Sequence, residues 1–167
     1  MGYLTSCEYA NFLGQTPADF ENLEWEAARL LDRYTTGVDG FRKLKNAFPT
    51  DEEAAECVKR CEARLIALLA EIKKTAASIG LVAASDGTVH NNVVSSVSAG
   101  NETISYQNPS TVKNEISAAA ENSAARYTLL YSTVREYLSG VRDANGVNLL
   151  FMGSYPRWAV KKCTEIQ

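Results

Sequence analysis

Residues 50–80 read TDEEAAECVKRCEARLIALLAEIKKTAASIG and contain no proline, and no glycine before Gly80. Apolar residues recur in this stretch at spacings of three and four, which predicts one long amphipathic helix. Its stripe consists of Ala54, Cys57, Val58, Cys61, Leu65, Leu68, Leu69, Ile72, Ala76 and Ile79. Its other faces carry Glu56, Lys59, Arg60, Glu62, Arg64, Glu71 and Lys73. A helix with a single face to bury needs partner helices.

Both ends of this helix are predicted by capping signals. Thr50 and Glu53 have the spacing of a capping box, and the acidic run Asp51-Glu52-Glu53 faces the positive end of the helix dipole. At the other end Lys73 and Lys74 lie in the last turns, and Gly80 can supply the left-handed residue that follows a helix.

Three further helices are predicted on either side of it. Thr5 and Glu8 form a capping box for a short helix that closes at Leu13-Gly14. Thr16 as cap and Pro17 in the first turn predict a second helix running to about Thr36. Ser110 caps a third long helix from about Thr111 to Ser139, which Gly140 ends. The stripe of the second helix consists of Phe20, Leu23, Ala27, Leu30, Leu31 and Tyr34.

The connection 41–49 is basic and carries Arg42, Lys43 and Lys45 between Phe41 and Phe48. Such a loop could contact phosphates, but a cluster of this size is common on protein surfaces. We therefore interpret it as a solvated connector that its two aromatic residues pin to the core.

A β-hairpin is predicted between the last two long helices. The segments Val93–Ala99 and Glu102–Tyr106 are rich in β-branched residues and flank a Gly100-Asn101 turn. A two-residue loop places Val97 opposite Ile104 and Ser98 opposite Thr103.

The chain after Gly140 combines an Asn145-Gly146 turn, the apolar run Val147–Met152 and a basic tail. Two interpretations of the run remain open. It can add as a strand to the hairpin edge of a neighbouring subunit. It can also fold back, with Leu149, Leu150 and Phe151 packed on its own helices, as most apolar runs do.

We thus predict a mainly α protein: a small bundle of three main helices and a short N-terminal helix. A single domain over 1–167 is expected, because this length buries a core of ordinary size. The helical core covers about 5–80 and 110–140, the hairpin arm about 91–107, and the extended C-terminal tail 141–167.

The bulk composition excludes several classes of function. A net charge of −3 and a pI near 5.3 argue against a sequence-independent grip on nucleic acid. The longest fully apolar run, Leu65–Ala70, is far short of the ~20 residues of a membrane span. With no basic and apolar leader pattern, we expect a soluble protein made in a cytoplasm. The scattered cysteines are not a secreted disulfide framework.

No motif predicts catalysis, a metal or a cofactor. Cys57 and Cys61 share a helix face, but both lie on the apolar stripe and no further ligands cluster with them. His90 is the only histidine and has no nucleophile motif beside it. The acidic run at 51–53 is explained by the helix dipole. Trp25 and Trp158 are interpreted as packing or interface residues.

The order of these features resembles one family. It comprises a Tyr-rich start (Tyr3, Tyr9), a helix ending Ala27-Ala28-Arg29-Leu30-Leu31-Asp32-Arg33-Tyr34-Thr35, Gly40-Phe41, Phe48-Pro49 and a long helix. A Ser-rich hairpin, a helix ending Val134-Arg135-Glu136-Tyr137-Leu138-Ser139-Gly140 and Leu149-Leu150-Phe151-Met152-Gly153 follow. Over most of Tyr3 to Gly153 the chain is similar to the head-tail connector (adaptor, or head-completion) proteins of tailed bacteriophages and prophages. The Arg157–Gln167 tail and the Ala-rich start of the third helix depart from the family pattern.

The resemblance implies a structural protein of the virion neck and no enzyme. Made in a bacterial cytoplasm, it would be a monomer or weak oligomer alone and a ring below the portal protein. There it would dock stopper or tail-completion proteins while DNA passes through without specific contacts. The candidate interface residues are Val97, Ile104, Tyr106, Leu149, Leu150, Phe151, Arg157, Trp158, Lys161 and Lys162. The alternative is a small helical regulatory or nucleic-acid-binding module.

Overall fold

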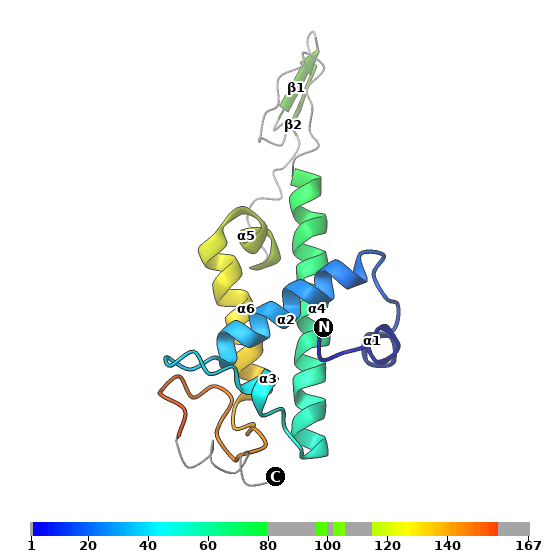
Figure 1. Ribbon diagram of the computed structural model, residues 1–167. Coiled ribbons are helices and arrows are strands. Elements are labelled where there is room, and N and C mark those ends of the chain that lie inside the picture. The colour runs from blue at the N-terminus through cyan, green and yellow to red at the C-terminus, as the bar shows by residue number, and fades with distance from the viewer. Residues whose placement is uncertain (1, 80–95, 100–101, 106–114, 157–167) are drawn as a thin grey trace. The chain divides into compact units, whose positions relative to one another are not determined.

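The computed structural model describes residues 2–79, 96–99, 102–105 and 115–156 (Figure 1). The described part is mainly helical, as predicted. Its elements are α1 (Ser6–Leu13), α2 (Phe20–Thr35), α3 (Lys43–Asn46), α4 (Glu52–Ile79), β1 (Ser96–Ala99), β2 (Glu102–Ser105), α5 (Glu115–Glu121) and α6 (Ser123–Leu138). Where the sequence predicts one domain, the chain divides into two compact units. The first unit comprises Met1–Ala70 and Thr128–Gln167, and the second comprises Glu71–Tyr127.

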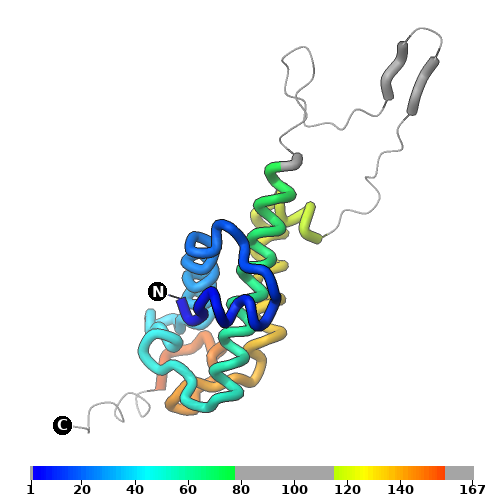
Figure 2. The backbone as a smooth tube through the Cα atoms, turned by 90° about the vertical axis from the view of Figure 1, so that its right-hand side faces the viewer, coloured from blue at the N-terminus to red at the C-terminus, as the bar shows by residue number. Residues whose placement is uncertain are grey.

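The core of the first unit is formed by the predicted helical stripes. Val58, Cys61 and Leu65 of α4 are fully buried, and they share one cluster with residues of α2 and of the 128–138 part of α6. Figure 2 shows α2 lying beside the first-unit part of α4. The α2 residues in this cluster are Leu23, Ala27, Leu31 and Tyr34. Helix α4 thus packs against α2 as one of the partners that its single apolar face requires.

The helix ends differ in detail from the prediction. The capping box of Thr5 and Glu8 on α1 is confirmed. Thr50 is not the cap of α4: Asp51 Oδ2 accepts from the Ala54 N–H at 3.0 Å, because Asp51 directly precedes the first helical residue. Nor does α2 begin after Thr16, since its cap position is Asp19. Gly80 lies outside the described residues.

In the second unit, β1 and β2 pair antiparallel with Val97 opposite Ile104 and Ser98 opposite Thr103. The other residues of the predicted arm 91–107 lie outside the described part of the chain.

The predicted continuous helix from Thr111 to Ser139 is wrong. Within the described residues it forms α5 and α6, separated at Asn122. The Asn122 side chain accepts from the Ala124 N–H at 2.8 Å, which caps α6, and Arg126 Nε donates to the Ala119 carbonyl at 3.0 Å, at the end of α5. An Asn side chain competes with the helix backbone for hydrogen bonds, so it favours a new helix start over continuation.

The C-terminal segment of the first unit folds back onto its own core. Gly140, at φ +84°, follows the end of α6, and the Gly146 N–H donates to the Asp143 carbonyl at 2.9 Å in the predicted Asn145-Gly146 turn. Leu149 is fully buried in the main cluster, and Val147 packs with Tyr155 and Phe41. Leu149 therefore packs on its own helices, which is the second of the two interpretations of the apolar run.

Candidate functional site

The sequence-predicted interface residues fall into three groups. Leu149 is buried and Leu150 half-buried, whereas Phe151 is 46% exposed. Val97 and Ile104 are paired in the backbone register of β1 and β2. Tyr106, Arg157, Trp158, Lys161 and Lys162 lie outside the described residues. The structure therefore brings only Phe151 of this set to a described surface of the first unit.

Phe151 belongs to a small exposed surface, which we call the apolar patch: Val38, Phe151 and Met152. Val38 is 76% exposed and Met152 is 49% exposed. The Val38 N–H donates to the Met152 carbonyl at 3.1 Å, which joins two segments far apart in the sequence. Large apolar side chains exposed together are typical of protein interaction surfaces.

Two glycines leave room for close contacts at the patch, one with backbone and one with the Phe151 ring. A Cβ at Gly37 would lie 2.7 Å from the Gly153 carbonyl oxygen, and a Cβ at Gly153 would lie 2.4 Å from Cζ of Phe151. The clash at Gly37 is with backbone, so that position requires glycine for this arrangement, whereas a side chain at position 153 would have to displace the Phe151 ring. The Phe151 ring thus lies against backbone rather than extending freely into solvent.

The Lys43 side chain forms hydrogen bonds with the backbone that carries the apolar patch. Its side chain is fully buried, and Nζ donates to the carbonyls of Thr35 at 2.9 Å, of Leu149 at 3.0 Å and of Phe151. Burial lowers the pKa of Lys43, against the opposing effect of Asp143 and Asp39. The prediction that Lys43 lies in a solvated connector is wrong. No local pattern signals its role, because two of its acceptors are more than 100 residues away.

A second set of contacts fixes the segment that follows the patch. The Tyr155 ring stacks on Phe41 with centroids 3.9 Å apart, and the Tyr155 N–H donates to Asp39 Oδ2 at 2.6 Å. The Tyr155 hydroxyl donates to Asp143 Oδ2. The hydrogen bonds from the Tyr155 and Phe41 amides lower the pKa of Asp39. Lys43 therefore holds the backbone within the apolar patch, and Tyr155 holds the segment that follows it.

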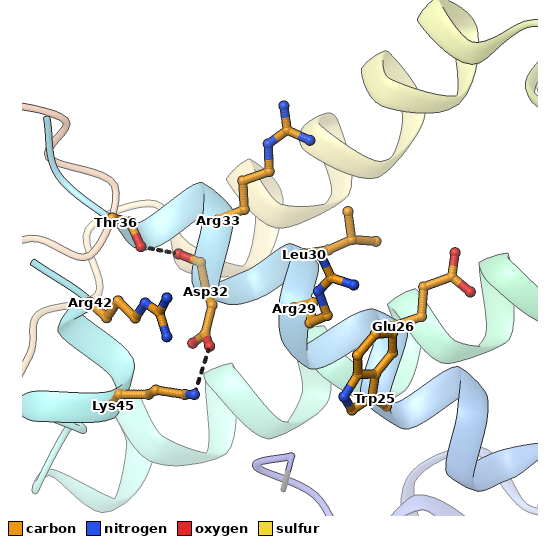
Figure 3. A pocket seen from close by; sticks show the side chains of 9 residues that line it. All are labelled: Trp25, Glu26, Arg29, Leu30, Asp32, Arg33, Thr36, Arg42 and Lys45. Carbon is orange, nitrogen blue, oxygen red and sulfur yellow. Dashed lines mark hydrogen bonds and ion pairs between the residues drawn. The ribbon is translucent and has the colours of Figure 1, made fainter. Parts of the chain in front are cut away.

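The first unit also carries a groove of about 740 Å³ along α2 (Figure 3). We call it the basic groove, since four basic and two acidic side chains line it. Its lining consists of Trp25, Glu26, Arg29, Leu30, Asp32, Arg33, Thr36, Arg42 and Lys45. Trp25 is 55% exposed, and the Arg29 guanidinium lies 4.6 Å from the centre of the Trp25 ring. Exposed Trp and Arg side chains are the types enriched at the energetic centres of protein interfaces.

The groove is positively charged although the whole chain is acidic. Asp32 is already engaged: its Oδ1 accepts from the Tyr3 hydroxyl, and its Oδ2 lies 3.8 Å from Nζ of Lys45. Arg33 extends away from the other labelled side chains in Figure 3. The sequence identifies Trp25 as a packing or interface residue, but helical spacing alone does not show that Arg29 stacks on it one turn later.

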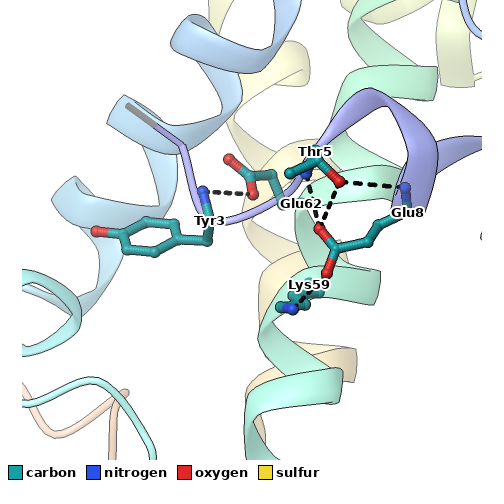
Figure 4. Close-up of polar contacts among 5 residues, drawn as sticks. All are labelled: Tyr3, Thr5, Glu8, Lys59 and Glu62. Atoms are coloured by element: carbon teal, nitrogen blue, oxygen red, sulfur yellow. Dashed lines mark hydrogen bonds and ion pairs between the residues drawn. The ribbon is translucent and has the colours of Figure 1, made fainter.

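The segment Gly2–Glu8 anchors next to α4 (Figure 4). The Tyr3 N–H donates to Glu62 Oε2 at 3.0 Å, and Lys59 pairs with Glu8. Glu62 is fully buried, whereas the helical pattern predicts it on an exposed face. Burial, with a further contribution from Glu24, raises the pKa of Glu62 to about 8. The hydrogen bond from Lys59 lowers the pKa of Glu8 to about 2.

Within the described residues, no group of three or more His, Cys, Asp or Glu side chains is arranged to hold a metal ion. The thiol of Cys61 is buried beside that of Cys57, and the burial raises its pKa. None of the described helices has the length and hydropathy needed to cross a membrane.

No protein-family model, no curated protein and no solved structure matches this chain. The described residues thus define a helical protein with two candidate interaction surfaces, the apolar patch and the basic groove.

Proposed function

We propose that this chain is a structural protein of a tailed bacteriophage or prophage particle, a head-tail connector that acts without catalysis. It assembles as a ring in the virion neck, between the portal protein and a stopper or tail-completion protein. The observation that carries the proposal is the apolar patch. Three large apolar side chains are exposed there, on a backbone held by the hydrogen bonds of Lys43 and by the stacking of Tyr155 on Phe41.

The patch supports a docking role for two physical reasons. Exposed apolar side chains release water when a partner covers them, which is the main favourable contribution to protein association. The preformed backbone limits the conformational entropy lost on binding. The order of helices along the chain, which resembles the connector family, indicates the class of partner.

The test is a patch variant, Val38→Ser/Phe151→Ser/Met152→Ser, in a bacterium that produces the particles. Leu13→Ser is the matched control, because Leu13 is exposed to a similar degree on α1. We expect the wild-type protein in purified virions, normal particles with the control, and DNA-filled heads without tails from the patch variant. Absence of the protein from virions would contradict the proposed function.

A regulatory or nucleic-acid-binding module is the second candidate, and the basic groove is the observation that favours it. Glu26 and Asp32 in the lining weaken its attraction for phosphates, and Lys43 is buried rather than free to bind them. A salt-sensitive gel shift of duplex DNA that Arg29→Glu/Arg33→Glu abolishes would support this candidate over the connector.

A further inference from the structure

We propose that the basic groove receives the acidic start of α4, residues Asp51, Glu52 and Glu53, from a second copy of this chain. The inference rests on the proposed ring and names the contact between its neighbouring subunits.

Charge complementarity is the first argument. Arg29, Arg33, Arg42 and Lys45 give the groove an excess of positive charge. Asp51, Glu52 and Glu53 are all exposed, and neither Glu52 nor Glu53 takes part in an ion pair among the described residues. The acidic start is thus a negative surface of the first unit that is open to a partner.

The shape of the occupant also fits. Ala54 and Ala55 follow the acidic residues, so the first turns of α4 present small side chains next to the charges. A slender helix end can approach the exposed Trp25 ring while its carboxylates meet the guanidinium groups. A carboxylate also accepts two hydrogen bonds from one arginine, which fixes the orientation of the contact.

The two surfaces are separate, which permits a head-to-tail contact between neighbouring subunits. The acidic start and the lining of the basic groove share no residue, and both are exposed on the same molecule. When the groove of each subunit binds the acidic start of the next subunit in one direction, the contact is heterologous, and it generates a ring when the rotation closes. A two-fold dimer would instead form the contact twice between the same two subunits and would stop at two.

The strength of such a contact agrees with assembly only where subunits are concentrated. Exposed ion pairs contribute little individually and weaken as salt is added. Free subunits then associate weakly, and binding to a common template raises their effective concentration.

A charge-reversal series tests the contact. In sedimentation at low salt we expect the mass of the wild-type protein to increase with concentration. Arg29→Glu/Arg33→Glu and Glu52→Lys/Glu53→Lys each place like charges on both sides of the contact, so each variant should lose this increase. A mixture of the two, or the combined fourfold variant, should regain it. Arg64→Glu/Arg135→Glu changes the charge equally at other exposed positions and should behave as wild type.

Crosslinking identifies the occupant directly. A photoreactive benzoylphenylalanine in place of Glu26 in the groove should yield covalent dimers in concentrated full-length protein. Mass spectrometry of a mixture of ¹⁵N-labelled and unlabelled chains should map them to the tryptic peptide 46–59 of the other copy. Thermal melting of every variant checks that the fold is intact.

The crosslinking experiment would overturn the inference if no covalent dimer forms at the highest soluble concentration, or if the crosslinks map to peptides other than 46–59. The charge-reversal series would overturn it if the mixture of the two variants does not regain the increase in mass. A gel shift of duplex DNA that Arg29→Glu/Arg33→Glu abolishes would assign the basic groove to nucleic acid and would also reject this contact. The proposed function fails separately, through absence of the protein from virions, so the two failures are distinguishable.

Discussion

Nζ of Lys43 lies 3.0 Å from the carbonyl oxygen of Leu149, a residue 106 positions later in the chain. The same ammonium group binds the carbonyl of Thr35 at the end of α2. A buried cation thus joins the N-terminal helices to the C-terminal segment. We expect these parts of the first unit to unfold together.

Lys43→Met should destabilise the first unit by about 3 kcal/mol or more, because it leaves three carbonyls without their donor, and each unsatisfied buried group costs about 1–3 kcal/mol. Urea denaturation measures the loss. The control is Lys45→Met, since that side chain is half exposed and forms only a long ion pair with Asp32. Equal stability of the two variants would show that the buried ammonium contributes nothing.

Glu62 should make the protein less stable as the pH rises from 5 to 8.5. The folded state keeps this proton up to a pKa of about 8, whereas the unfolded chain releases it near 4.5. The stabilising contribution is complete below pH 4.5 and is lost as the pH rises through 8, at about 1.4 kcal/mol per unit of pKa difference.

Glu62→Gln should remove most of this slope and be more stable than wild type at pH 8.5, as measured by denaturation at each pH. Glu56→Gln, at an exposed position of the same helix, should keep the wild-type slope. The range avoids the opposite effect of Glu8, which loses its contribution only as the pH falls from 4.5 through its pKa of about 2. Parallel slopes for wild type and Glu62→Gln would refute the assignment.

Leu68→Asp should abolish the cooperative thermal transition of the first unit. Leu68 is buried in the main cluster, and an unpaired buried charge costs several kcal/mol out of a typical stability of about 5–15 kcal/mol. Arg64→Asp introduces the same carboxylate at an exposed position of α4 and should melt almost like wild type. Circular dichroism during heating distinguishes the two.

Asn122→Ala should weaken the start of α6 by about 1 kcal/mol, because it removes the side chain that accepts from the Ala124 N–H. Faster hydrogen exchange of that amide is the expected signature. Asn122→Asp keeps an accepting oxygen at the same place and should retain slow exchange. Unchanged exchange in Asn122→Ala would mean that the cap is dispensable.

The local parts of the fold could be predicted from the sequence. The stripes of α2 and α4, the capping box of Thr5 and Glu8 and the Asn145-Gly146 turn each depend on residues a few positions apart. Spacing and capping chemistry are therefore sufficient for them. The prediction of one continuous helix failed at Asn122. Good helix formers surround this residue, but its own side chain competes with the helix backbone for hydrogen bonds.

The parts of the candidate site that were missed depend on contacts between distant segments. Lys43 and Glu62 are charged residues on helices, and periodicity assigns such residues to solvent. Their burial follows from partners elsewhere: the carbonyls of Leu149 and Phe151 for Lys43, and the Tyr3 amide for Glu62. Val38 gave no signal, because its place beside Met152 exists only after the chain has folded.

The hydrogen bond between Val38 and Met152 makes the apolar patch a discontinuous epitope. A synthetic peptide covering 147–156 reproduces one half of this surface and lacks the other, so it should not compete with the folded protein for a partner. A partner that needs both halves of the patch consequently binds only the folded subunit. If the proposed function holds, a subunit whose C-terminal segment has not docked would present no complete epitope and would be excluded from assembly without any separate proofreading factor.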